Sequence, residues 1–301
     1  MRLLLIALYI ILQSILLKGQ GCSDAGACSI QTFDFEDNLS DSQRKISLSF
    51  DQSVALGEKF IFISQSTLGV QYSITSFTRV ELRIPFIFTY GNLGYTSGIG
   101  DMILSVSQDF IRDKNFQITG VIGGRLKTNN SNFSFDNQPL PMAYQTSLGT
   151  YDIILGSQYT RAKWNLYIAY QHPFGRNASE YLVPEYEINT DKQYFESAYL
   201  KRGDDLYLRA QYILSLKKHN SIKFNLLTIY RIQKSEIIKN DQNIILDGSN
   251  GLTVNPGIIY SKQLKNSRKL SFLLAFPIID RAYRADGLTR NIIFGLRINN
   301  L

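Results

Sequence analysis

The sequence predicts an all-β fold: a closed antiparallel transmembrane β-barrel of about twelve strands, with counts from about ten to about fourteen compatible with it. Three observations lead to this prediction. Apolar residues alternate with polar ones over runs of about ten residues, the length that a tilted strand needs to cross a bilayer. Short connections between these runs alternate with long ones, and an apolar export segment precedes them all.

The last run of the chain shows the alternation clearly. Residues 291–299 place four apolar side chains on one face and mostly polar ones on the other, because successive side chains of a strand point to opposite faces. The apolar face consists of Ile292, Phe294, Leu296 and Ile298, and the other of Asn291, Ile293, Gly295, Arg297 and Asn299. One face therefore suits lipid and the other a polar interior.

Similar patterns predict twelve strands, each with boundaries uncertain by several residues. They are 45–56, 60–74, 78–91, 100–111, 115–127, 150–161, 164–173, 204–217, 221–234, 252–262, 268–279 and 289–300. Three prolines fall inside them, at Pro85, Pro256 and Pro277. Proline removes a donor from the ladder, so each is expected to mark a bulge or a local error in the assignment.

The connections support the barrel further. With the N-terminus in the periplasm, even-numbered connections should be tight turns, and five short polar segments fit: 75–77, 112–114, 161–163, 218–220 and 263–267. Odd-numbered connections should be longer, and four comply: 128–149, 174–203, 235–251 and 280–288. The first odd connection, 57–59, is short. Alternation of short periplasmic turns with long external loops is typical of outer-membrane barrels, whereas a soluble sandwich has no reason to show it.

Composition and charge exclude other classes. No segment after the export signal offers the ~18 uncharged apolar residues of a membrane-spanning helix. The net charge is +7 and the pI about 9.2, but there is no clustered basic helix and no nucleic-acid motif, so nucleic acid is not an expected partner. The chain has only two histidines, which are far apart, and no cofactor or metal site is predicted.

The N-terminal region predicts three parts. Residues 1–20 have the basic start, apolar stretch and small polar end of a signal peptide, although a single membrane anchor is an alternative. Residues 21–44 are polar and partly acidic, as expected for a periplasmic extension, and residues 45–301 form the barrel. Cys22 and Cys28 are candidates for a local disulfide in an oxidising compartment, and lipid attachment to Cys22 is the alternative.

Two stretches resemble a known family. Residues 98–104, Gly-Ile-Gly-Asp-Met-Ile-Leu, are similar to the Gly-Leu-Gly-Asp strand entry of the outer-membrane family named for putative meta-pathway phenol degradation. Leu140-Pro141 followed by 147–156 resembles that family's later Leu-Gly-Thr-Gly segment, with Tyr151 in place of its second glycine. The start Cys-Ser-Asp-Ala-Gly-Ala-Cys looks like that of exported Bacteroidetes barrels. The chain ends in Leu301, where such barrels commonly carry an aromatic residue. The resemblance implies export or uptake of small, often aromatic, molecules.

The polar face of the strands supplies the candidate lumen-lining residues. They are Arg79, Glu81, Arg83, Asp101, Arg125, Asp152, Arg209, Arg231 and Arg297. An excess of positive charge in a narrow lumen would favour anionic or polar aromatic solutes through local potential and guanidinium stacking. Alternatively, these charges pair with one another across the barrel and fill it; Arg79, Glu81 and Arg83 share one face and suit such a ladder.

The predicted function is therefore that of an outer-membrane channel or transporter for a small-molecule solute, and not of an enzyme. Its expected partners are outer-membrane lipid and, during insertion, the barrel-assembly machinery. A structural or surface-binding role carried by loops 128–149 and 174–203 is the alternative. A lipid hydrolase is less favoured: His172 has lipid-facing parity near the external end, but no serine motif accompanies it, and such hydrolysis needs nucleophile, base and orienting group together.

Overall fold

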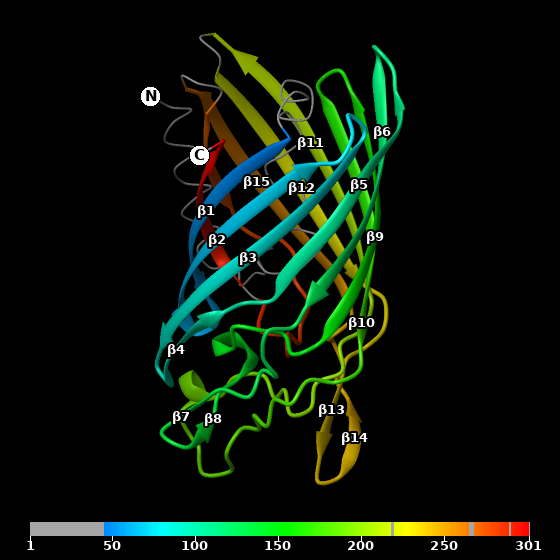
Figure 1. Cartoon of the computed structure of the whole chain (residues 1–301). Coiled ribbons are helices and arrows are strands. Elements are labelled where there is room, and N and C mark those ends of the chain that lie inside the picture. Colours follow the sequence, from blue (N-terminus) through cyan, green and yellow to red (C-terminus); the bar gives the residue numbers. More distant parts are fainter. Residues whose placement is uncertain (1–44, 218–219, 265–267, 289, 301) are drawn as a thin grey trace.

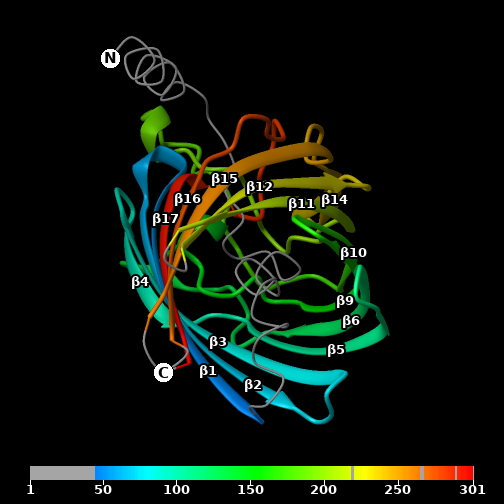
Figure 2. The same ribbon diagram turned by 90° about the horizontal axis from the view of Figure 1, so that it is seen from above.

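The computed structural model describes residues 45–217, 220–264, 268–288 and 290–300. Within these residues, thirteen strands pair in one antiparallel sheet, and the sheet closes on itself through the pairing of β2 with β3. One of the thirteen, β4 (Gly94–Ile99), is a short strand that pairs only with β3, so twelve strands form the wall of the barrel. The predicted barrel and its strand number are confirmed (Figures 1 and 2).

The wall strands lie close to the segments predicted from the alternation. They are β1 (Ile46–Gly57), β2 (Phe62–Ser73), β3 (Thr78–Gly91), β5 (Met102–Arg112), β6 (Phe116–Leu126), β9 (Tyr151–Arg161), β10 (Trp164–Phe174), β11 (Asp205–Leu216), β12 (Asn220–Arg231), β15 (Gly251–Gln263), β16 (Lys269–Ala275) and β17 (Arg290–Asn299). Each pairs with its sequence neighbours, and β1 pairs with β17, with Ser49 opposite Asn299. A closed sheet has no free edge, which lipid requires.

The two faces of the wall differ as the parity predicts. Leu208 is 51% exposed on the outer face, whereas its neighbours Tyr207 and Arg209 are each 1% exposed inside. Phe294 is likewise 52% exposed and Arg297 only 2%. Apolar side chains on the outside and buried polar ones on the inside match a barrel that is surrounded by acyl chains.

Pro85 and Pro256 lie where a strand changes or loses a neighbour on one side. β3 pairs with β5 up to Arg83 and with β4 from Phe86, so the missing N–H of Pro85 falls at the switch. Pro256 lies one residue beyond Gly257, the last position at which β15 pairs with β16. In both strands the ladder on the other side continues through the proline without a bulge. The prolines therefore occupy positions that need no donor.

Pro277 corrects the prediction of a strand over 268–279. β16 ends at Ala275, two residues before this proline, and the chain then contacts β15 through separate backbone hydrogen bonds and an isolated bridge between Val254 and Ile279. Proline has no N–H to continue the ladder, and the apolar residues that follow belong to the connection to β17.

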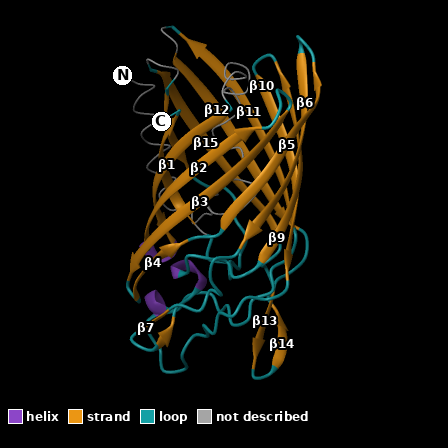
Figure 3. Ribbon diagram, in the orientation of Figure 1, coloured by secondary structure: helices purple, strands orange, loops and turns teal. Residues whose placement is uncertain are grey.

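The two ends of the barrel differ strongly (Figure 3). At the end that we call the turn end, described connections such as Ala162–Lys163 are tight. At the opposite end, the loop end, the long connections carry β7 (Ser134–Phe135), β8 (Gln138–Pro139), β13 (Glu236–Lys239), β14 (Gln242–Ile245) and the 3-10 helices η2 (Met142–Tyr144) and η3 (Thr190–Lys192), and the short connection after β1 carries the 3-10 helix η1 (Glu58–Phe60). These short elements were not predicted.

The hairpin β13–β14 had a sequence signal that the prediction of a loop over 235–251 missed. Asn240 and Asp241 both have positive φ, 53° and 58°, and they join two short apolar segments. Asn and Asp tolerate this conformation, which a two-residue hairpin turn requires. No helix in the described part of the chain has the length and hydropathy to cross a membrane, a result that concerns helices only.

The predicted signal peptide (1–20) and N-terminal extension (21–44), with Cys22 and Cys28, lie outside the described residues. They remain predictions.

Candidate functional site in the barrel interior

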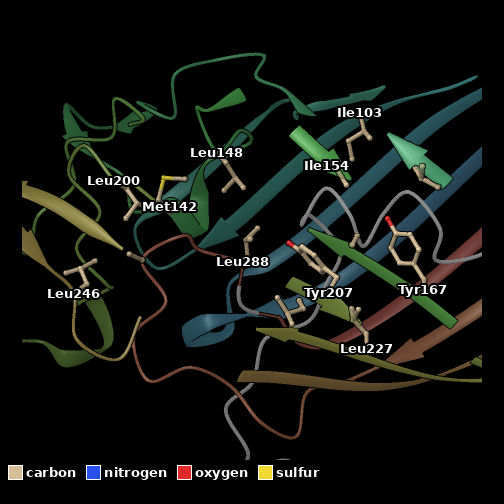
Figure 4. Packing of buried hydrophobic residues seen from close by; sticks show 14 of the residues in the cluster. Ile103, Met142, Leu148, Ile154, Tyr167, Leu200, Tyr207, Leu227, Leu246 and Leu288 are labelled. Carbon is tan, nitrogen blue, oxygen red and sulfur yellow. The ribbon is translucent and has the colours of Figure 1, made fainter. Parts of the chain in front are cut away.

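The long connection between β6 and β9 folds inward at the loop end. Every residue from Leu140 to Thr150 is buried. Met142 and Leu148 pack in one apolar cluster with Ile103 of β5 and Ile154 of β9, whose side chains point inward (Figure 4). The backbone N–H of Leu148 also donates to Asp101 Oδ2 at 2.9 Å. This segment therefore narrows the interior.

A second inward segment belongs to the connection between β16 and β17. Arg284 to Leu288 are all buried, and Leu288 joins the same apolar cluster as Leu148 (Figure 4). Its Asp286 Oδ2 accepts hydrogen bonds from Arg231 Nη1 of β12 at 2.8 Å and from Arg281 Nη2 at 2.9 Å. Arg231 also forms a bidentate pair with Asp205 of β11, at 2.9 and 2.7 Å. The segment is thus tied to β12, which is separated from β16 by one strand, β15.

The ionisation of Asp286 follows from these contacts. Burial alone raises the pKa of a carboxyl group, but the guanidinium groups of Arg281 and Arg231 more than offset it. The pKa of Asp286 is therefore well below its ordinary value. Burial, together with the nearby Arg231, lowers the pKa of Arg281 from its ordinary value.

A third buried ion pair ties the connection between β10 and β11 to the wall. Asp152 of β9 accepts from Arg125 of β6, from Arg202 Nη2 at 2.7 Å and from Gln171 of β10. Arg202 lies just before β11, so it brings the end of the 174–203 loop onto the inner wall. Arg125 Nε is also 3.8 Å from Asp101 Oδ2.

Further pairs connect wall strands to one another. Asp51 of β1 pairs with Arg83 of β3 and with Arg297 of β17, whose Nε lies 3.1 Å from Asp51 Oδ1. Arg83 also pairs with Glu81 at 3.2 Å. Of the predicted Arg79–Glu81–Arg83 ladder, only the Glu81–Arg83 part forms along one strand.

Arg79 pairs across strands instead. Its Nη2 lies 3.0 Å from Asp109 Oδ1 of β5, near the turn end. Asp109 also pairs with Arg112 and accepts from Thr119 Oγ1 at 2.7 Å.

A cavity of about 120 Å³ lies between the inward segments and the walls. Its lining contains Asp51, Arg83, Asp101, Arg209, Asp286 and Arg290, together with uncharged polar groups such as Gln65, Asn225 and Asn255 and apolar groups such as Leu227 and Leu288. The charged lining residues comprise three acids and three arginines, so their formal charges cancel.

The structure brings together some predicted lumen residues and separates others. Arg83, Asp101 and Arg209 line the cavity, and Arg125, Asp152, Arg231 and Arg297 lie buried in the ion pairs around it. Arg79 and Glu81 are half-buried nearer the turn end. Whether these nine residues line a path for a solute stays a prediction.

The charged interior residues that were missed include Asp51, Asp205, Arg202, Arg281 and Asp286. Asp51 and Asp205 had a signal, because each lies next to an outward apolar residue, Phe50 or Leu206, in a predicted strand. The other three lie in long connections, where no periodicity reports the direction of a side chain.

His172 lies on the outer face near the loop end, as its parity predicted. Its Nδ1 lies 2.6 Å from Asp204 Oδ1, and Tyr170 Oη donates to Asp204 Oδ2 at 2.7 Å. Its ring packs edge-on against Phe174. Within the described part of the chain, the hydrogen bond and the ring contact of His172 involve Asp204 and Phe174 and no serine. Nor do the described residues contain a group of three His, Cys, Asp or Glu side chains placed to hold a metal.

Comparisons with known proteins agree with this architecture. No protein-family model matches the sequence, and no curated protein matches it. Among solved structures, an outer membrane channel from Pseudomonas putida F1 is 15% identical with a TM-score of 0.54, over 85% of this chain and 93% of that one. The KdgM porin is 8% identical (TM-score 0.46, 85% and 98% covered), and the NanC porin 10% (0.47, 84% and 97%).

The first of these matches supports the fold. The family suggested by residues 98–104 and 140–156 is supported only at the level of outer-membrane barrels, and its phenol-degradation name stays a prediction. By its strand number, closure and likeness to a solved channel, the chain has the fold of an outer-membrane β-barrel.

Proposed function

We propose that this protein is an outer-membrane channel through which a small molecule passes. The observation that carries the proposal is the cavity of about 120 Å³ inside a closed barrel whose outer face is apolar and whose inner face is polar. A barrel kept only for structural support would gain by filling this space, because voids forfeit packing contacts.

The inward segments 140–150 and 284–288 set the width of the proposed path. They lie at the loop end, which faces the exterior in the proposed orientation. Their burial and their contacts with several strands of the wall support a restricted channel, narrower than the open lumen of porins with 16–18 strands. We expect a small conductance.

The sequence favoured an anionic or aromatic solute because of its excess of interior arginines. In the structure, Arg79, Arg83, Arg125, Arg231 and Arg297 all lie in ion pairs with aspartates. A paired charge presents a weaker field to a passing ion than an isolated one. Size and hydrogen bonding are therefore proposed to matter more than net charge.

In this proposal the apolar outer face contacts outer-membrane lipid, the N-terminal segment directs export, and the barrel-assembly machinery inserts the chain. The closed sheet supports this because its wall strands pair into a ring with no free edge strand, as a membrane demands.

A surface-binding role is the second candidate, and one observation favours it. Two large side chains of the loop 174–203 are strongly exposed although they do not belong to the lipid-facing strands: Tyr186 is 74% exposed and Ile188 is 90% exposed. Loop tips that carry exposed apolar groups are common binding surfaces.

Conductance in planar bilayers tests the channel against this alternative. The refolded protein should produce discrete, small current steps at a frequency that rises with protein concentration. A correctly folded barrel without such steps, and without solute entry into proteoliposomes, would contradict the channel and favour the surface-binding role.

A further inference from the structure

One side chain in the cavity wall has a hydrogen-bonding capacity that the described residues leave unused. Asn255 of β15 is 3% exposed and lines the cavity, and neither its Nδ2 nor its Oδ1 has a hydrogen-bond partner. A buried amide that remains unsatisfied is destabilising, so a group that supplies both an acceptor and a donor is favoured beside it.

Two further lining residues present unused acceptors. Gln65 of β2 donates through Nε2 to Thr67, but its Oε1 has no partner. Asp101 accepts from Leu148 through Oδ2, and its Oδ1 has no hydrogen-bond partner. With Asn255, the cavity wall offers three acceptors and one amide donor, a set that suits a ligand with O–H or N–H groups.

The cavity lining beside Asn255 is largely apolar. The neighbouring strand β16 contributes the small side chain of Ala275 to it. On the other side, Leu227 of β12 lies opposite Asn255 and separates it from Arg209 of β11. The amide of Asn255 therefore lies next to the apolar side chain of Leu227. Leu148 and Leu288, which belong to the same apolar cluster as Leu227, also line the cavity.

The charge of the lining does not favour an ion of either sign. Its three acidic and three arginine side chains have formal charges that cancel, and Asp51 and Asp286 each pair with two arginines. An ionic solute would lose its hydration shell on entering, and the balanced formal charge of the lining gives neither sign of ion a net attraction.

We propose that this cavity is a binding site for an uncharged small molecule that carries hydroxyl or amide groups beside an apolar body, with Asn255 as a specificity-determining residue. The inference rests on the proposed channel, since it names the solute class that the channel favours. The amide of Asn255 donates to the ligand's oxygen and accepts from its O–H or N–H, while Leu227 and Leu288 contact its apolar part.

Three solutes of nearly equal shape test the proposal: isobutyramide, isobutyrate and isobutylammonium, each radiolabelled and offered to proteoliposomes that contain the full barrel. Isobutyramide should enter faster than either ion. Asn255→Leu should slow isobutyramide entry about fivefold, the factor that one ordinary hydrogen bond represents, and leave the two ions unchanged.

Asn165→Leu is the matched control. Asn165 of β10 is 1% exposed inside the barrel and also lacks partners for both side-chain polar atoms, but it does not line the cavity. Its replacement should leave the preference for isobutyramide intact. Faster entry of isobutyrate than of isobutyramide, or an unchanged preference in Asn255→Leu, would overturn the proposal.

Saturation-transfer NMR in detergent separates this inference from the proposed channel. The site is supported if the wild type transfers saturation to isobutyramide, Asn255→Leu abolishes this transfer and Asn165→Leu preserves it. If, in addition, no solute crosses the membrane, only the proposed channel is contradicted. Absence of any transfer to isobutyramide from the folded wild type would overturn the site while leaving conduction of ions unaffected.

Discussion

The loop end and the turn end of the barrel both contain buried ion pairs, but these pairs connect different parts of the molecule. At the loop end, Asp286 and Arg202 belong to connections, and they pair with Arg231 and Asp152 on the wall. At the turn end, Asp109 pairs with Arg79 of the neighbouring strand and with Arg112 of its own. The ion pairs at the loop end hold segments inside the barrel, and those at the turn end hold neighbouring strands together.

Because of this difference, loss of a buried ion pair should have different effects at the two ends of the barrel. Breaking a pair at the loop end should release a segment and widen the path, whereas breaking one at the turn end should weaken the wall without opening anything. Conductance and stability are therefore expected to respond independently at the two ends.

The largest effect on conductance is expected from Asp286→Ala. The change leaves Arg281 buried beside Arg231 with no carboxylate between them, and losing one partner of a buried pair costs about 3 kcal/mol or more. The segment 284–288 should leave the interior, and the single-channel current should rise severalfold in planar bilayers.

The double variant Asp286→Ala with Arg281→Ala serves as the control for charge repulsion. If the segment is held by the carboxylate, the double variant should also conduct more than wild type. A wild-type current in both variants would show that apolar packing of Leu288 alone holds the segment, and the proposed role of the loop end would be wrong.

The contrast between the two ends also limits what the sequence can predict. The alternation placed the twelve wall strands to within a few residues, because lipid on one side and polar groups on the other impose a period of two on every strand. The same parity would have identified Asp51 and Asp205 as interior residues. The predicted strand beyond Ala275 failed because apolar residues 278 and 279 continued the pattern past Pro277.

The candidate site was predicted less well than the wall. Arg83, Asp101 and Arg209 could be assigned to the inner face from the alternation. Which of the charged side chains form ion pairs depends on the register between strands, and the sequence of one strand does not determine that register. Asp286, Arg281 and Arg202 depend on the path of long connections. These have no periodicity, so their inward course had no signal in the sequence.

A smaller increase in conductance is expected from Asp152→Ala. Arg202 and Arg125 would lose their shared carboxylate, and the end of the 174–203 loop should loosen. The rest of that loop stays tied to the rim through Tyr194 Oη, which donates to Asn92 Oδ1 at 2.5 Å. We therefore expect about a doubling of the current, against the larger rise in Asp286→Ala.

Asp152→Asn tests the same contact with its shape preserved. It keeps an acceptor for Arg202 but removes the charge, so its current should fall between those of wild type and Asp152→Ala. An increase as large as that of Asp286→Ala would mean that the 174–203 loop, and not 284–288, narrows the interior.

Acidification should affect the loop end only under strong acid. The pKa of Asp286 is lowered in the folded protein, because Arg281 and Arg231 outweigh the effect of burial. A carboxyl group with a lowered pKa stabilises the docked segment fully above its undocked pKa of about 4, and this contribution is lost as the pH falls further. Current measured from pH 7 to pH 4.5 should therefore be constant. A rise centred near pH 6 would contradict this account of the Asp286 contacts.

The smallest effect on conductance is expected at the turn end, from Asp109→Ala. Its carboxylate is fully buried and holds Arg79, Arg112 and Thr119, so its loss should lower the free energy of unfolding by about 2 kcal/mol in urea titrations. No inward segment depends on it, and the single-channel current should equal that of wild type. An increase in current in Asp109→Ala as large as that expected for Asp286→Ala would contradict this comparison. The ion pair between Asp109 and Arg79, which joins two wall strands, would then also control the width of the channel.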